Sequence, residues 1–138
     1  MEKIQITIKI NATITTVWDL WTDLEHIKQW AKTMGGWHIT NVENDVRDNG
    51  AFNFRMESLD GELSFDHKGI YQKVVPYELL SQSLDDGRRT EIAFKTVGKT
   101  VQITETFEPQ PNEPIDLQQE FCRSVLESFK SYAENYKG

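Results

Sequence analysis

The sequence is poor in cysteine, in basic side chains and in long apolar segments. Its single cysteine, Cys122, can form no internal disulfide and excludes a metal site built from several cysteines. The longest apolar run spans only a few residues, far short of the ~20 that a transmembrane helix needs. The N-terminus also lacks the apolar core of a secretory signal. We therefore expect a cytoplasmic protein that does not insert into a membrane.

Acidic residues outnumber basic ones, 22 against 15, which gives a formal net charge of −7. Proteins that bind nucleic acid use clustered Lys and Arg side chains to displace the counterions of the phosphates. Here the basic residues are scattered, and Arg88-Arg89 is the only adjacent pair. We therefore expect neither a nucleic acid nor an anionic membrane surface as a partner.

Proline is scarce as well, and three of the four prolines lie within residues 108–114. A segment so rich in proline cannot continue a strand. It is predicted to be a loop that separates a strand-rich body from one C-terminal helix. The roughly 24 residues after it are too few to fold alone, so we predict a single domain over residues 1–138.

The N-terminal part predicts one strand and two short helices. Every second residue from Ile4 to Ile10 is isoleucine and the residues between are polar, the period of a half-buried strand. A helix capped by Asn11 or Thr13 is predicted to follow, to about Trp21. A second short helix is predicted over Leu24–Thr33.

From Trp37 onward, strand patterns alternate with turn residues and end in a helix over residues 115 to about 135. Consecutive strands with tight turns form an antiparallel sheet. The fold class is therefore α+β, with a curved sheet of six to seven strands wrapped around the long C-terminal helix. The predicted turns are Asp48-Asn49-Gly50, Asp60-Gly61, Pro76, Asp85-Asp86-Gly87 and Gly98-Lys99. The predicted apolar stripe of the last helix is Leu117, Phe121, Val125, Phe129, Tyr132 and Tyr136.

Short motifs accompany this order of elements: Val17-Trp18 with Leu20 and Thr22, Ile27-Lys28-Gln29-Trp30, Gly36-Trp37, Asp45-Val46-Arg47-Asp48-Asn49-Gly50, Asp60-Gly61, Gly69, Pro76-Tyr77-Glu78-Leu79 and Gly98-Lys99-Thr100. From about residue 3 to 136 the chain resembles the START-like (SRPBCC) superfamily and its helix-grip fold. More narrowly, it resembles the branch named after the activator of the ninety-kilodalton heat-shock-protein ATPase. Two positions depart from that pattern: Asn49 replaces a usual glycine, and Phe121-Cys122 lies where the family has Gly-Trp.

The resemblance implies a cavity between sheet and helix that holds an apolar small molecule. Strand alternation would place His67 and Glu105 in it, where each needs a partner, a water or a ligand. Two alternatives stay open: His67 is a satisfied core histidine, and a bulge turns Glu105 outward. The four tryptophans between Trp18 and Trp37 either border the cavity or anchor the two short helices. The predicted ligand-binding residues are Trp21, Trp37, Phe52, Phe54, Met56, Phe65, His67, Tyr71, Phe94, Glu105, Phe121, Val125 and Phe129.

Three functions are compatible with these patterns. The first is a carrier or sensor that binds an apolar or aromatic small molecule, a lipid included, without catalysis and without a cofactor. The second is an enzyme of the cyclase or aromatase type that uses His67 and Glu105 as acid and base. The third is a module that contacts a chaperone, which in the family works beside an additional N-terminal domain. The three histidines lie in different elements, so we predict no metal, and we expect Cys122 to be a buried structural thiol.

Overall fold

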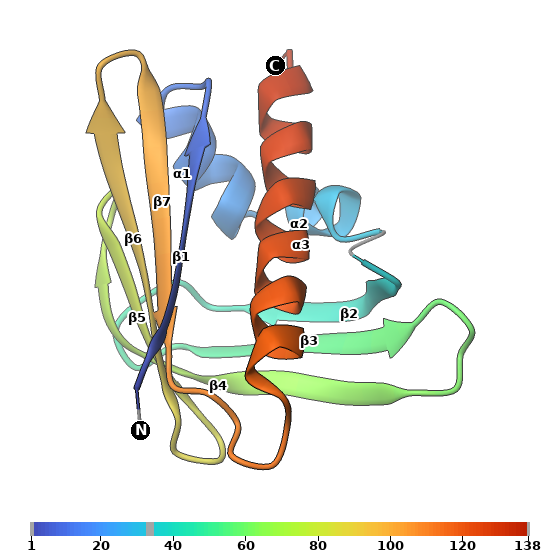
Figure 1. Cartoon of the computed structure of the whole chain (residues 1–138). Helices are drawn as coiled ribbons and strands as arrows, with labels where there is room; N and C mark the ends of the chain where they lie inside the picture. Colours follow the sequence, from blue (N-terminus) through green and yellow to red (C-terminus); the bar gives the residue numbers. More distant parts are fainter. Residues whose placement is uncertain (1, 33–34, 138) are drawn as a thin grey trace.

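A curved antiparallel sheet wraps around one long helix in the computed structural model, which describes residues 2–32 and 35–137 (Figure 1). The sheet has seven strands, within the six to seven that the sequence predicts. The elements in chain order are β1 (Ile4–Ile10), α1 (Ile14–Thr22), α2 (Leu24–Trp30), β2 (Trp37–Asn44), β3 (Ala51–Ser58), β4 (Ser64–Val75), β5 (Leu79–Leu84), β6 (Arg89–Val97), β7 (Thr100–Phe107) and α3 (Ile115–Asn135).

The strands lie in the order β1-β7-β6-β5-β4-β3-β2. Tight turns join the neighbours from β2 to β7, while β1 is brought from the other end of the sequence to pair with β7. In Figure 1, β1, β7 and β6 stand beside α3, and β2, β3 and β4 cross behind its lower half. The sheet therefore has a concave face that grips α3, and this is the helix-grip fold that the sequence predicts.

Local hydrogen bonds explain where the two short helices begin. The hydroxyl oxygen of Thr13 accepts a hydrogen bond from the backbone N–H of Thr16 (3.3 Å), so Thr13 rather than Asn11 caps α1. Asp23 both ends α1 and caps α2 with its carboxylate. The helix α2 ends at Trp30, and the predicted end at Thr33 lies outside the described residues.

The turn before β3 is built on a left-handed residue. Asn49 has φ of 66°, a conformation that asparagine tolerates better than most residues, so it can replace the usual glycine. Its N–H donates to the carbonyl of Tyr71 (2.8 Å), and the N–H of Tyr71 donates to the carbonyl of Gly50 (2.8 Å). This turn therefore packs directly against the middle of β4.

The helix α3 is rotated relative to the predicted stripe. Its buried residues are Cys122, Leu126, Phe129 and Ala133, whereas Leu117 is 57% exposed. Tyr136, the other end of the predicted stripe, follows the helix and is exposed as well. The prediction was wrong at both ends because a series spaced by four residues drifts about 40° per step around a helix of 3.6 residues per turn. No helix in the described part of the chain is long and apolar enough to cross a membrane.

Candidate functional site

The upper part of the concave face is a packed aromatic core under α1 and α2. The ring of Trp21 stacks on Trp30, with 5.2 Å between centroids, and meets the edges of Phe129 (4.9 Å) and Phe94 (6.2 Å). All four side chains are buried. Trp21 therefore contacts two other predicted ligand-binding residues here, Phe94 and Phe129.

The lower part of the same face is more open. The rings of Trp37, Phe65 and Phe121 form a triangle, with centroid distances of 5.3, 6.1 and 6.3 Å. We call these three residues the aromatic triad. Phe65 is 40% exposed, and the other two are half-buried. The triad connects the starts of β2 and β4 to the first half of α3, where Val125 is also half-buried.

A third group of predicted residues lies on β3 and β4. The ring of Phe54 is nearly parallel to the imidazole of His67, 6.2 Å away, and Phe52 contacts both His67 (5.9 Å) and Tyr71 (5.0 Å). Met56 is buried opposite Phe65 in the strand register. Phe54 and His67 are half-buried, so part of this group is exposed.

A hydrogen-bonded network that sequence reasoning missed supports this group. The hydroxyl of Tyr71 donates to the side-chain oxygen of Asn44, whose amide nitrogen donates to the carbonyl of Thr22 (3.0 Å). Gln82 on β5 is buried and also bonds to Tyr71. Burial raises the pKa of Tyr71, so the phenol stays protonated. The one available signal was Gln82, a polar residue between the apolar Leu80 and Leu84.

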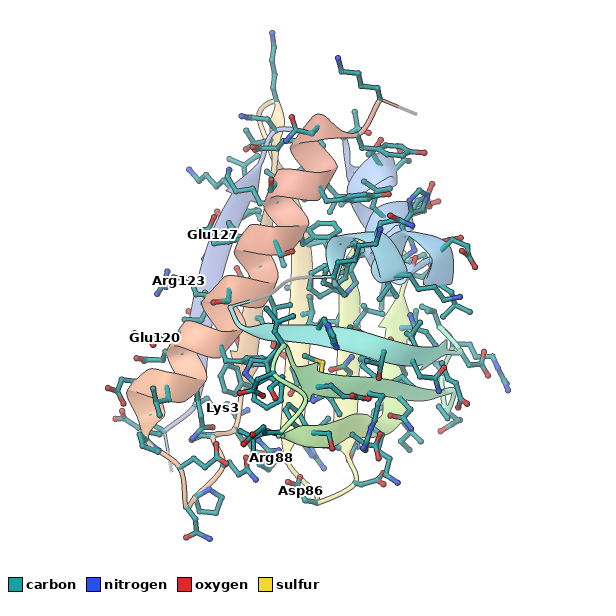
Figure 2. The ribbon with its side chains drawn as sticks, turned by 90° about the vertical axis from the view of Figure 1, so that its right-hand side faces the viewer. Lys3, Asp86, Arg88, Glu120, Arg123 and Glu127 are labelled. Carbon is teal, nitrogen blue, oxygen red and sulfur yellow. The ribbon has the colours of Figure 1, made fainter. Side chains whose placement is uncertain are left out.

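His67 is an uncharged polar group on the apolar face. Burial, together with the positive charge of Arg88, lowers the pKa of His67 to about 4, so the imidazole is neutral at pH 7. Neither ring nitrogen makes a hydrogen bond to any other residue that the structure describes. His67 is therefore not the satisfied core histidine of the alternative. Arg88 is paired with Asp86 (Nε to Oδ2, 2.7 Å) at the lower end of the sheet (Figure 2).

Glu105 faces α3 from the middle of β7. It lies opposite Ile6 on one side and Ile92 on the other, with no shift of register, so the alternative of a bulge that turns it outward is wrong. The carboxyl of Glu105 is hydrogen bonded to the thiol of Cys122. Burial raises the pKa of Glu105 to about 7.

Cys122 is buried, as predicted. Burial and the neighbouring Glu105 both raise the pKa of the thiol, which is therefore protonated and unreactive at neutral pH. Among residues 2–32 and 35–137, no three His, Cys, Asp or Glu side chains are grouped so that they could hold a metal ion.

His67 and Glu105 share the concave face, but the structure gives them different neighbours. The charges that act on His67 belong to Arg88 and Asp86, whereas Glu105 interacts with Cys122. Two strands, β5 and β6, separate β4 from β7 in the sheet. The two side chains therefore do not contact each other directly.

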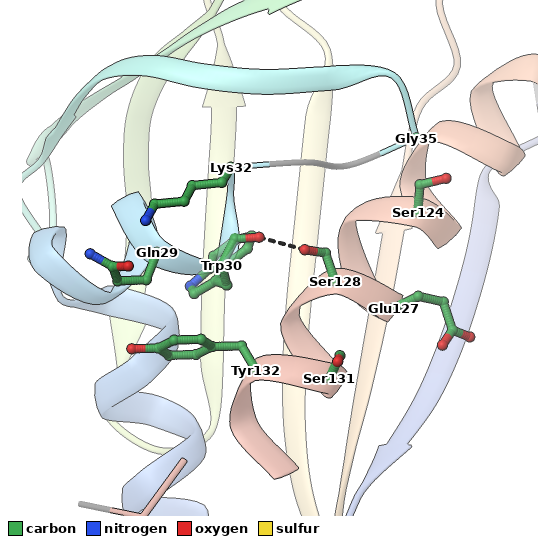
Figure 3. A pocket seen from close by; sticks show the side chains of 9 residues that line it. All are labelled: Gln29, Trp30, Lys32, Gly35, Ser124, Glu127, Ser128, Ser131 and Tyr132. Atoms are coloured by element: carbon green, nitrogen blue, oxygen red, sulfur yellow. Dashed lines mark hydrogen bonds between the residues drawn. The ribbon is translucent and has the colours of Figure 1, made fainter. Parts of the chain in front are cut away.

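A surface hollow lies outside this face, between α2 and α3 (Figure 3). The hydroxyl of Ser128 on α3 donates to the carbonyl of Trp30 across it, which ties α2 to α3. A second hollow lies beside the start of β1 and the start of α3. The first hollow is lined by Gln29, Trp30, Lys32, Gly35, Ser124, Glu127, Ser128, Ser131 and Tyr132.

The sequence of residues 11–134 matches the model of a protein family described as Activator of Hsp90 ATPase homolog 1-like protein. The chain belongs to this family. A comparison with curated proteins found no match.

Solved structures agree with this assignment to the Hsp90 ATPase activator homologue family. Chr148 from Cytophaga hutchinsonii is 37% identical, with a TM-score of 0.82 over 96% of this chain and 92% of that one. The AHSA1-like protein from Aeromonas hydrophila is 28% identical, with a TM-score of 0.81 over 98% and 99%. The Aha1 dimer from Colwellia psychrerythraea is 15% identical, with a TM-score of 0.74 over the full length of both chains, which shows a shared fold.

In this member of the Hsp90 ATPase activator homologue family, two contacts of the site are made by Phe121 and Cys122, the residues at which the chain departs from the family pattern. Phe121 contributes a ring to the aromatic triad, and Cys122 bonds to Glu105. The residues that replace the usual Gly-Trp thus shape the lower, open part of the concave face.

Proposed function

We propose that this chain binds an apolar small molecule between the concave face and the first half of α3, without catalysing a reaction. The observation that carries the proposal is the contrast between the two parts of that face. Under α1 and α2 the inward side chains are buried, whereas Phe54, His67, Glu105, Phe121 and Val125 keep part of their surface exposed. Apolar walls with a few polar groups are typical of small-molecule sites.

The aromatic triad is the proposed entrance. Its three rings come from β2, β4 and α3, and each pair meets in a T-shaped arrangement. Rotation of one ring would open the face without breaking a backbone hydrogen bond. A ligand would then lie against Phe54 and the neutral His67, whose free nitrogens can donate and accept one hydrogen bond each.

The proposal is tested with the neutral apolar fluorophore N-phenyl-1-naphthylamine, by titration and by following the backbone amides with NMR. We expect saturation at one probe per chain, with shifts confined to β3, β4, β7 and the first half of α3. Phe54→Arg should weaken binding about tenfold or more by placing a charge against the probe. Ile70→Arg is the matched control, because Ile70 is exposed on the opposite face of the same sheet. Absence of saturable binding, or equal effects of the two variants, would overturn the proposal.

A second candidate is an enzyme in which Glu105 transfers a proton. A carboxyl with a pKa of about 7 is suited to general acid–base catalysis at neutral pH. The cyclase or aromatase mechanism requires one bound molecule to reach both Glu105 and His67. NMR contacts from a bound probe to both side chains would support it, whereas contacts to only one would remove it.

A contact with a chaperone is a third candidate. Leu59 and Leu63 are exposed on the hairpin between β3 and β4, and Ile115 and Leu117 are exposed at the start of α3. Apolar residues on a surface are suited to a protein partner. We expect Leu63→Asp to weaken any acceleration of a purified Hsp90-type ATPase by this chain. If the unchanged chain does not alter that ATPase rate, this candidate fails.

A further inference from the structure

We propose that the bound molecule carries a basic nitrogen and that the carboxyl of Glu105 binds this nitrogen. The inference rests on the proposed function and names the chemical class of its ligand: an apolar, ring-containing amine. It rests on the apolar side chains around Glu105 and on the single hydrogen bond that its carboxyl makes in the described structure.

Glu105 is a carboxyl among apolar side chains. Its neighbours across the strands are Ile6 and Ile92, and both are buried. Its one hydrogen bond in the described structure comes from the thiol of Cys122, which is a weak donor. A carboxylate has about four lone-pair positions. Most of the hydrogen-bonding capacity of this group is therefore left for a ligand.

Neither Arg123 nor Arg88 serves as its counter-ion. Arg123 follows Cys122 on α3 but is exposed, and Figure 2 shows it pointing away from the sheet, between Glu120 and Glu127. Arg88 is paired with Asp86 and acts on His67. The residues that face Glu105 from β1 and β6 are the uncharged Ile6 and Ile92.

The physical reason for a cation is the cost of an isolated charge among apolar side chains. A carboxylate held in apolar surroundings is stabilised by an opposite charge within a few ångströms. A ligand ammonium would supply this charge and fill the free lone pairs. Its ring would pack against Phe121, next to Cys122, where the face of an aromatic ring also attracts a cation.

The titration of Glu105 supports the same assignment. With a pKa of about 7, the carboxyl of Glu105 is protonated at mildly acidic pH. The groups that face it are Cys122 on α3, which stays a protonated thiol, and uncharged residues on β1 and β6. A bound ammonium would favour the carboxylate, so the pKa of Glu105 should fall when the amine binds.

The test compares three ligands with one ring system: 1-naphthylmethylamine, 1-naphthalenemethanol and 1-naphthoic acid, at pH 8. We expect the amine to bind at least about tenfold tighter than the alcohol, and the acid to bind least well. Glu105→Gln should remove the preference for the amine over the alcohol. Glu91→Gln is the matched control, because Glu91 is exposed on β6 and neighbours Ser81 and Thr106 on the outer face.

The outcomes separate this inference from the proposed function. Binding of the alcohol with no preference for the amine overturns the inference and leaves the proposed function standing. Binding of none of the three contradicts the proposed function itself. A preference that survives Glu105→Gln overturns the role of Glu105. If that variant does not fold, carbon NMR of the Glu105 carboxyl in the unchanged protein decides: its pKa must fall with the amine and not with the alcohol.

Discussion

The hydroxyl of Tyr71 on β4 donates a hydrogen bond to the side-chain oxygen of Asn44 at the end of β2, with 2.5 Å between the two oxygens. Asn44 in turn donates to the carbonyl of Thr22 at the end of α1. This pair therefore connects three elements that are far apart in the sequence, directly beside the face where a ligand is proposed to bind.

Removal of the Tyr71 hydroxyl should destabilise the protein. Tyr71→Phe removes the hydroxyl that donates to the side-chain oxygen of Asn44 and that bonds to the buried Gln82, and such a loss typically costs about 1–3 kcal/mol. Urea denaturation measures the free energy of unfolding. The control is Tyr77→Phe on an exposed ring, where a change within about 0.5 kcal/mol is expected. Equal losses in the two variants would show that the network contributes no stability.

Glu105 should make the protein less stable as the pH rises from about 4.5 to 7. Below this window the carboxyl is protonated in both states. Within it the unfolded chain releases the proton at its ordinary pKa of 4.5, while the folded chain keeps it up to about 7. The free energy of unfolding therefore falls by an amount on the order of 3 kcal/mol across the window and levels off above it.

The Glu105→Gln variant has no proton to release at this position. Its free energy of unfolding should therefore rise relative to that of the unchanged protein as the pH increases through this window. Urea denaturation at several pH values measures the difference between the two. Parallel pH profiles would contradict the raised pKa of Glu105.

Gly69 should tolerate no side chain. A Cβ at this position would lie 2.1 Å from the carbonyl oxygen of Ser83, so Gly69→Ala must push β4 away from β5. We expect a loss of about 3 kcal/mol or more in thermal or urea denaturation, or a failure to fold. Gly61→Ala is the matched control, because that glycine has open space around it and costs only the strain of a positive φ, about 1–2 kcal/mol. A smaller loss for Gly69→Ala than for Gly61→Ala would refute this packing argument.

The two parts of the concave face should differ in their response to truncation. Phe129→Ala removes a fully buried ring that contacts Trp21 and Trp30, and a loss of about 3–5 kcal/mol is expected. Phe121→Ala removes a half-buried ring of the aromatic triad and should cost less than about 2 kcal/mol, since it buries less surface. It should also speed the entry of the naphthylamine probe, measured by stopped-flow fluorescence. Similar stability losses would argue against an open lower part.

Most of the secondary structure could be predicted, because its signals lie between neighbours along the chain. The isoleucines of β1 alternate over residues 4–10, Thr13 can cap only a helix that starts beside it, and Asn49 and Gly61 mark turns. The rotation of α3 could not be predicted in the same way. Phe121 and Cys122 are adjacent in the sequence and both are apolar. Which of the two is buried depends on how the sheet curves around the helix.

The candidate site could likewise be predicted from the sequence only in part. The side of the strand on which His67 and Glu105 lie follows from the two-residue period of a strand, so the sequence alone predicted both on the inner face, with a bulge at Glu105 as the open alternative. It also determined the antiparallel sheet and the long last helix. Only the tertiary structure decided that Arg88 acts on His67, that Cys122 bonds to Glu105 and that Asn44 holds Tyr71. These pairs join residues 17 or more positions apart along the chain. Their distances are determined by strand order and by the curvature of the sheet, which no local pattern encodes.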